Sequence, residues 1–389
     1  MTKFYNVYDF GAVGDGIADD TAAVQAAIDA AAAEGAEVHF LPGVYSVGEL
    51  FLHKASVLTA NPNWGYAPNA VGTTVLKQRF DDQRSLLNVS NALYLTINGL
   101  ALLGKPDVGS CCGIYGKKVR PGSTGELCIE RTKVSSFSQD ALFLDNVGCI
   151  SIRGCQFGFS GRDGIHAFNS PDYYLIDTWM SGNRGCGFAG YDENCSVTMT
   201  GCRIEWNGIG VAIYGGSHYQ LTGNYIDRSY REGILLTSGF CKGYETYCNT
   251  ITMTGNIIYR SGKEDPNCAH LKMDHCIGVT AANNTFCIGR DDHGNGYNSP
   301  NIGVQITDCK QCVVSQNTLF MGAMQTLVKQ ENNEDCYIEN NPGSLFDDKL
   351  SNNRVLLPST AFAIAMLNPD AQIDCDADSQ TDHAQVQKW

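Results

Sequence analysis

The chain has 389 residues and a formal net charge of −14, which is too acidic to favour nucleic acid or an anionic membrane as a partner. Its first ten residues contain no cationic segment followed by an apolar run, and no stretch reaches the length of a membrane span. We therefore expect a soluble protein without an export signal, located in the cytoplasm, that binds neither nucleic acid nor membrane.

Residues 1–45 are predicted to form a cap in front of the repeats described below. Val7–Phe10 is a short apolar run that we expect to be a strand. Asp20 or Thr21 suits the N-cap of a helix that continues through an alanine-rich segment to Ala33. A helix in this place would cover an open strand edge, which otherwise pairs with other chains.

A pattern of 23 residues organises the middle of the chain. An apolar residue recurs at this interval, each time directly after a glycine or an alanine. A fixed period of this length with short alternating strands is typical of a solenoid, in which each coil buries its apolar side only against its neighbours. We predict such coils for residues 46–345, and a closing strand with a polar tail for residues 346–389. The apolar residues of the pattern are Leu142, Ile165, Phe188, Val211 and Ile234.

Small and polar residues recur where the second strand of each repeat ends. We expect the asparagines among them to hydrogen-bond from coil to coil and the cysteines to be small buried side chains. The 17 cysteines are an odd number, which together with these positions favours a reducing compartment over a disulfide framework. Cys309 and Cys312 have metal-ligand spacing but lack a second pair, so we predict neither a metal nor a cofactor. The recurring residues are Cys155, Thr178, Cys202, Asn224 and Asn256.

The segment Asp9–Thr21 reads Asp-Phe-Gly-Ala-Val-Gly-Asp-Gly-Ile-Ala-Asp-Asp-Thr, and Leu41–Tyr45 reads Leu-Pro-Gly-Val-Tyr. Together with Gln25 and Ile28, these segments resemble the amino-terminal signature of the pectate-lyase-like superfamily, which includes lyases, glycoside hydrolases, uronan epimerases and phage tailspikes. The resemblance implies an all-β fold, a right-handed parallel β-helix with an N-terminal capping helix, and it is compatible with a homotrimer. The Tyr-Gly-x-Asp-Pro-His run that is usual in the epimerase branch does not occur in this sequence.

Stacked coils place equivalent residues about 4.8 Å apart, so the repeat can be searched column by column for paired carboxylates. Three residues beyond the turn position, Glu205 and Asp227 become neighbours in adjacent coils. Two like charges at that distance raise the pKa of one, which lets one carboxyl act as an acid while the other stays ionised. Glycoside hydrolysis uses such a pair, so we predict that both residues are catalytic.

A second column, directly before the repeat glycine, holds the catalytic candidates Asp163 and Glu232, which are three coils or about 14 Å apart. At that distance they cannot act on one bond, but each can flank a substrate that lies along the coils. His166 points outward by strand alternation and is a candidate for carrying a proton or binding a sugar. Nearby aromatic and arginine side chains suit sugar rings and carboxylates, although core packing and neutralisation of nearby acids explain them equally well. These substrate-binding candidates are Trp179, Arg184, Arg203, Trp206, Arg228 and Tyr259.

The expected function is an enzyme that acts on a carbohydrate substrate. The leading hypothesis is a glycoside hydrolase or related transferase that uses the Glu205–Asp227 pair on an oligosaccharide. A lyase or epimerase acting on uronates is the first alternative, because the arginine concentration would suit a carboxylated sugar. The others are a fructotransferase or hydrolase of the difructose-anhydride type and a non-catalytic, tailspike-like β-helix that binds glycans.

Overall fold

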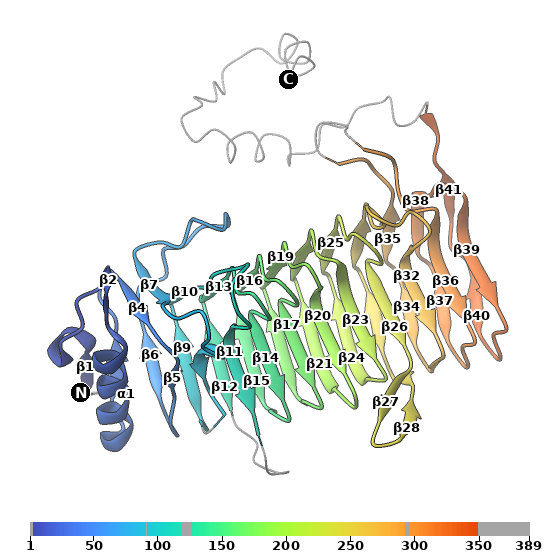
Figure 1. Cartoon of the computed structure of the whole chain (residues 1–389). Helices are drawn as coiled ribbons and strands as arrows, with labels where there is room; N and C mark the ends of the chain where they lie inside the picture. Colours follow the sequence, from blue (N-terminus) through green and yellow to red (C-terminus); the bar gives the residue numbers. More distant parts are fainter. Residues whose placement is uncertain (1–2, 91, 119–125, 292–295, 349–389) are drawn as a thin grey trace, which may run out of the picture.

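The computed structural model describes residues 3–348, except residue 91 and the segments 119–125 and 292–295. The chain forms a right-handed parallel β-helix with an N-terminal capping helix, as predicted (Figure 1). Each coil contributes one strand to each of three long parallel sheets, which we name sheets A, B and C in the order in which the chain enters them. The closing strand predicted at Ala361–Met366 lies outside the described residues.

The strands of the three sheets and of one hairpin have the following bounds. Sheet A contains β1 (Phe4–Asn6), β3 (Glu37–His39), β6 (Val57–Thr59), β9 (Leu95–Asn98), β12 (Leu127–Glu130), β15 (Ile150–Arg153), β18 (Tyr173–Ile176), β21 (Cys195–Thr200), β24 (Ser217–Thr222), β29 (Cys248–Asn249), β30 (Thr252–Thr254), β33 (Cys276–Ile277), β34 (Thr280–Ala282), β37 (Val313–Ser315) and β40 (Tyr337–Glu339). Sheet B contains β2 (Asp15–Asp19), β4 (Gly43–Val47), β7 (Thr74–Gln78), β10 (Ala101–Leu103), β13 (Lys133–Ser135), β16 (Gln156–Gly158), β19 (Trp179–Ser181), β22 (Arg203–Glu205), β25 (Tyr225–Asp227), β31 (Ile257–Tyr259), β35 (Thr285–Cys287), β38 (Thr318–Ala323) and β41 (Gly343–Leu345). Sheet C contains β5 (Leu50–Phe51), β8 (Ser85–Asn88), β11 (Cys112–Lys117), β14 (Leu142–Asp145), β17 (Ile165–Phe168), β20 (Cys186–Tyr191), β23 (Ile209–Tyr214), β26 (Ile234–Thr237), β32 (Ala269–Asp274), β36 (Ile302–Thr307) and β39 (Thr326–Glu331). The antiparallel hairpin is made of β27 (Gly239–Cys241) and β28 (Tyr244–Thr246).

The first part of the chain covers the end of the β-helix. Helix α1 (Thr21–Glu34) begins and ends close to the predicted positions, and Gly35 closes it in the left-handed conformation at φ 65°. The predicted strand at Val7–Phe10 is wrong: these residues form a 3-10 helix, η1, and the strand β1 precedes them. The carboxylate of Asp20 does not cap α1 but accepts hydrogen bonds from the backbone N–H groups of the preceding loop.

The 23-residue pattern lines the interior of the β-helix. Leu142, Ile165, Phe188 and Val211 lie in register in sheet C and are fully buried. Burial of a side chain of this size contributes about 1.5–3 kcal/mol to stability. Alternate residues of the same strands face outward, so the period that builds the core also lines up one outward residue from each coil.

An asparagine ladder fixes the turn between sheets A and B in the second half of the molecule. Asn224 donates from Nδ2 to Oδ1 of Asn256 at 2.9 Å, and Asn256 donates in the same way to Asn284 at 2.9 Å. Asn284 then donates to Asn317, and Asn317 to Asn341. The backbone N–H of each residue also binds the next amide oxygen, so the predicted coil-to-coil bonding is confirmed.

Cysteines occupy the same turn in the earlier coils and act as small buried donors. Cys155 donates to the carbonyl of Ile129 at 3.3 Å and Cys202 to that of Leu175 at 3.4 Å. Every cysteine among the described residues is free. No helix in the described part of the chain combines the length and hydropathy of a membrane span.

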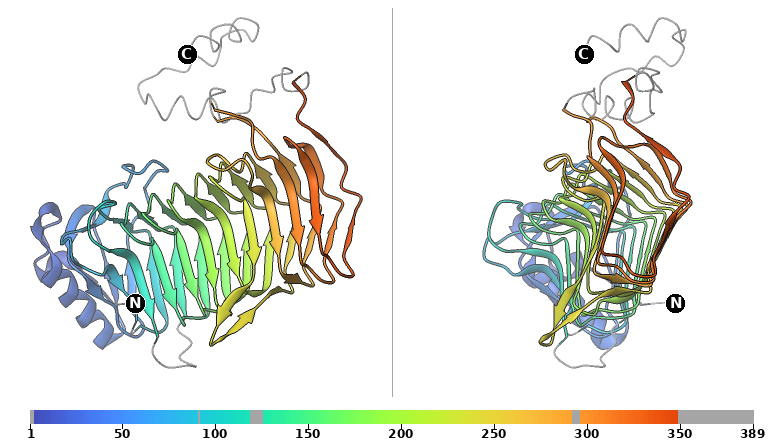
Figure 2. Two further views of the ribbon diagram at one scale, coloured as in Figure 1. Left: turned by 45° about the vertical axis from the view of Figure 1, so that its right-hand side comes forward. Right: turned by 90° about the vertical axis from the view of Figure 1, so that its right-hand side faces the viewer.

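Two segments leave the coils. The hairpin β27–β28 projects from the corner between sheets C and A (Figure 2). Residues 61–72, which we call the strap, lie on the outer side of sheet B, where Trp64 donates from Nε1 to the carbonyl of Arg131 at 2.8 Å.

Candidate functional site

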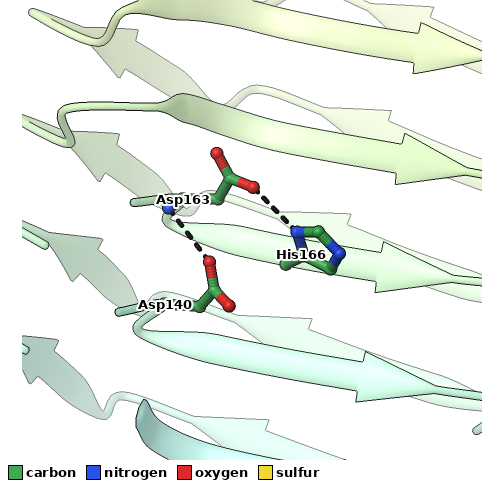
Figure 3. Close-up of side chains that lie close together, drawn as sticks. All are labelled: Asp140, Asp163 and His166. Carbon is green, nitrogen blue, oxygen red and sulfur yellow. Dashed lines mark hydrogen bonds and ion pairs between the residues drawn. The ribbon is translucent and has the colours of Figure 1, made fainter. Parts of the chain in front are cut away.

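A hydrogen-bonded aspartate and histidine stand on the outward side of sheet C (Figure 3). Asp163 lies in the turn that leads into β17, and His166 is the second residue of that strand. The Asp163 Oδ2 atom is 2.8 Å from Nδ1 of His166, and its Oδ1 accepts the backbone N–H of Cys186 at 2.7 Å. Gly164 allows this turn to approach the next coil, since a Cβ atom there would lie 2.7 Å from the carbonyl oxygen of Gly187.

The coil before the dyad holds it in place. Asp140 accepts the backbone N–H of Asp163 at 3.1 Å and the Nε of Arg162 at 2.7 Å, and it also pairs with the Nη2 of Arg162. Asp140 is fully buried, whereas the side chain of Arg162 is 43% exposed. The Nη1 of Arg162 donates to no described residue and is therefore available to a ligand.

His166 belongs to a row of stacked rings that crosses five coils, from Tyr115 to Tyr214. Its ring centroid is 5.1 Å from that of Phe143 and 4.6 Å from that of Tyr191, and Tyr191 is followed by Tyr214 at 4.7 Å. The residue opposite His166 in the next strand is Ala189, whose small side chain leaves room for Tyr191 to lean toward the histidine.

The polar ends of three of these rings are free. The Nε2 atom of His166 and the hydroxyl groups of Tyr191 and Tyr214 make no hydrogen bond with a described residue. Burial raises the pKa of Tyr191 above its ordinary value and that of Tyr214 to about 12, so both phenols stay protonated at neutral pH. With Asp163 on Nδ1, His166 presents a proton acceptor at Nε2 beside a tyrosine proton donor.

Two groups of side chains have the spacing of cation ligands. The oxygen and nitrogen atoms of Asp140, Asp163 and His166 lie within 4.8 Å of one another, and so do those of a second group, Asp274, His275 and Asp308. In the first group Arg162 already supplies the positive charge that a cation would bring to Asp140. The carboxylate of Asp140 is therefore already paired within the protein.

The predicted pair Glu205 and Asp227 is in register on sheet B, as expected from the column. Asp227 is buried and pairs with Arg228 and Arg260, each at 2.5 Å. Glu205 is also buried and pairs with Arg203 at 3.1 Å. Each of the two carboxylates is thus paired with at least one arginine.

The other predicted residues divide between the two sheets. Sheet B carries Trp179, Arg203 and Tyr259, and Trp206 lies in the turn directly after β22. Arg184 lies in the turn that leads from sheet B to sheet C, where its side chain is 70% exposed and pairs with Asp107. Glu232 precedes β26, three strands along sheet C from Asp163, and is buried 3.5 Å from Nη2 of Arg231. The structure therefore brings Asp163 and His166 together, brings Glu205 and Asp227 together, and leaves the two pairs on different sheets.

The sequence reasoning did not assign roles to Phe143, Arg162, Tyr191 and Tyr214. The signal for the tyrosines was present, because Tyr191 and Tyr214 are 23 residues apart and lie in register. The contact between His166 and Tyr191 could not be predicted from the 23-residue spacing, because the two residues occupy different columns of the repeat.

The fold defines the class: this chain is a right-handed parallel β-helix protein. The profile of the right-handed β-helix region matches residues 110–251. Solved structures with the same fold include the A-module of the mannuronan C-5 epimerase AlgE6 from Azotobacter vinelandii, with a TM-score of 0.53 and 18% identity over 88% of this chain and 98% of that one. Tailspike protein 2 of bacteriophage CBA120, in its enzymatically active domain, has a TM-score of 0.69 and 15% identity over 87% and 52% of the two chains.

The relatives found by sequence come from Azotobacter vinelandii. Mannuronan C5-epimerase AlgE5 is 29% identical over 252 residues, which is 55% of this chain and 24% of that protein. Alginate lyase 7 is 31% identical over 176 residues, 42% of this chain and 20% of that protein. The match thus spans about a quarter of the length of these relatives.

Proposed function

We propose that this protein is a carbohydrate-active enzyme that cleaves a uronate-containing polysaccharide by β-elimination. The observation that carries the proposal is the Asp163–His166 hydrogen bond of 2.8 Å with Tyr191 stacked on the histidine. The sequence relatives act, by their names, on mannuronan and alginate, which supports a uronate as the substrate.

Each group has a role in removing the proton beside a uronate carboxyl group. The Nε2 atom of His166 takes the C5 proton, while Asp163 fixes the tautomer and stabilises the imidazolium that forms. The C5–H pair of electrons forms the C4=C5 double bond, the C4–O bond breaks, and the Tyr191 hydroxyl gives its proton to the leaving oxygen. Arg162 would bind the carboxylate through its free Nη1 and neutralise the charge that develops there.

Elimination suits this arrangement better than epimerisation does. His166 and Tyr191 project from the same face of sheet C with ring centroids 4.6 Å apart, so both reach one face of a bound sugar. Epimerisation returns a proton to the opposite face of C5, where this pair of residues supplies no donor. The Tyr-Gly-x-Asp-Pro-His run usual in the epimerase branch is also missing from the sequence.

The hydrolase hypothesis from the sequence ranks below elimination. Hydrolysis needs one carboxyl that can be protonated and a second that activates water or attacks the sugar. Asp227 is held by two arginines and Glu205 by a third, and Asp140 is bound by Arg162. We therefore assign the sheet B carboxylates to pairing with arginines rather than to bond cleavage.

The test is a product analysis on polyuronates of different composition, with a neutral glucan for comparison. Elimination produces one unsaturated end, seen by its ultraviolet absorbance, for each new reducing end, and His166→Gln is expected to abolish both signals. New reducing ends without absorbance would instead identify a hydrolase. A changed C5 configuration without cleavage, observed by NMR, would identify an epimerase.

A further inference from the structure

A second candidate ligand surface lies on sheet B, separate from the dyad. The strap crosses the outer side of this sheet and is held there by buried side chains. Lys133 donates from Nζ to the carbonyls of Gly65 at 2.7 Å and Ala67 at 2.5 Å, and Gln156 donates to the carbonyl of Tyr66 at 2.9 Å. These bonds fix Tyr66 over one end of an aromatic surface.

Tyr66 forms one wall of that surface. Its ring centroid is 4.5 Å from that of Trp179 and 6.5 Å from that of Trp206, and its hydroxyl is 2.5 Å from Oγ of Ser181. Gly182 follows Ser181 in the left-handed conformation at φ 72°, and a Cβ atom there would lie 2.7 Å from the ring of Phe159. Both tryptophans are only half-buried, so part of each indole remains accessible from outside.

Arg203 continues the surface along the sheet. Its guanidinium lies 5.6 Å from the ring of Trp179 and 4.5 Å from the ring of Tyr225, in a row set by the register of β19, β22 and β25. Glu205 binds the Nε and Nη2 of Arg203 and so holds the group flat. The side chain of Arg203 is nevertheless 43% exposed. A flat cation between aromatic rings is suited to a ring-shaped ligand that carries a negative charge.

The local charge favours an anion although the whole chain is acidic. The side chain of Arg203 is 43% exposed, whereas its partner Glu205 is buried, so the accessible charge beside these rings is positive. We propose that the surface formed by Tyr66, Trp179, Arg203, Trp206 and Tyr225 binds an anionic oligosaccharide. The proposal rests on the proposed function only for the choice of a uronate as the ligand.

Tryptophan fluorescence reports directly on this surface. The chain has four tryptophans: Trp179 and Trp206 belong to the surface, Trp64 to the strap, and Trp389 lies outside the described residues. The experiment uses the full chain with Trp389→Phe to remove the unrelated signal and His166→Gln to prevent turnover. Titration with an oligomannuronate is expected to change the emission, and a neutral oligosaccharide of equal length is expected to leave it unchanged.

The variant Arg203→Gln is expected to weaken oligomannuronate binding at least about tenfold, because it removes the planar charge between the rings. Arg153→Gln is the matched control, since it removes an exposed arginine from sheet A. The double variant Arg203→Met, Glu205→Gln leaves no unpaired carboxylate, and thermal melting checks that each variant folds. Absence of any emission change, or equal affinities of the Arg203→Gln and Arg153→Gln variants, would overturn the proposal. Because binding is measured, the outcome is independent of whether the enzyme eliminates or hydrolyses.

Discussion

Replacing Asp163 by asparagine should inactivate the enzyme while leaving its shape intact. The amide oxygen can still accept the Cys186 N–H that Asp163 accepts at 2.7 Å. The amide NH2 group would then face Nδ1 of His166, where the carboxylate now accepts at 2.8 Å. This contact forces the proton of the imidazole onto Nε2, so the atom that should accept the C5 proton becomes a donor.

The expected loss of catalytic rate is large compared with the expected loss of folding stability. General base catalysis contributes on the order of 10² to 10⁴ in rate, or about 3–5 kcal/mol, whereas the lost charge-assisted hydrogen bond contributes about 1.5–3 kcal/mol to folding. Initial rates on a polyuronate and thermal melts measure the two effects separately. Asp274→Asn is the matched control, because Asp274 also binds a histidine Nδ1 at 2.8 Å, in His275 on the same sheet. An Asp163→Asn enzyme that keeps its rate within about threefold of the Asp274→Asn enzyme would refute the assignment.

Three further predictions concern buried polar groups. Burial lowers the pKa of His270 from 6.5 to about 3. Between these pH values the unfolded chain therefore binds a proton that the folded chain does not. The free energy of unfolding then falls by about 1.4 kcal/mol for each pH unit of acidification. His270→Gln should remove this slope in urea unfolding measured against pH, and an unchanged slope would contradict it. Asn256→Ala should lower the unfolding free energy by about 3 kcal/mol or more, because four hydrogen bonds to its side chain are lost, whereas Asn69→Ala, at an exposed position, should change it little. Lys133→Met should leave strap carbonyls without a donor and speed proteolysis within residues 61–72, and cleavage no faster than in an exposed-lysine variant, Lys77→Met, would argue against that role.

The sequence predicts the coils well because one period controls both burial and register. The stacking of coils that buries Ile165 and Phe188 also places Glu205 opposite Asp227, and both consequences are observed. The ladder of Asn224 and its successors was predictable for the same reason, since identical side chains at one turn satisfy each other's hydrogen bonds.

The candidate site was harder to predict from the sequence, because it depends on contacts between different columns of the repeat and on ion pairs between arginines and carboxylates. His166 was expected to point outward, but its stacking on Tyr191 depends on the small Ala189 in the intervening position. The pairing of Asp227 with Arg228 and Arg260 joins residues that are neighbours in sequence or one coil apart. Column counting identifies which carboxylates are adjacent, but side-chain geometry decides which of them keep a free oxygen.

Because the coils around His166 repeat, the length of the outward face of sheet C can change in units of whole coils. The histidine faces Ala189 in the next coil and Ala212 in the coil after that, while Tyr191 is followed in register by Tyr214. Removal of residues 188–210 would join Gly187 to Val211 and bring the second alanine and the second tyrosine into the places of the first. The shortened chain would keep the immediate neighbours of His166 on a shorter face, so in the proposed enzyme the length of bound glycan could change by duplication or loss of coils without any change in the proposed catalytic residues.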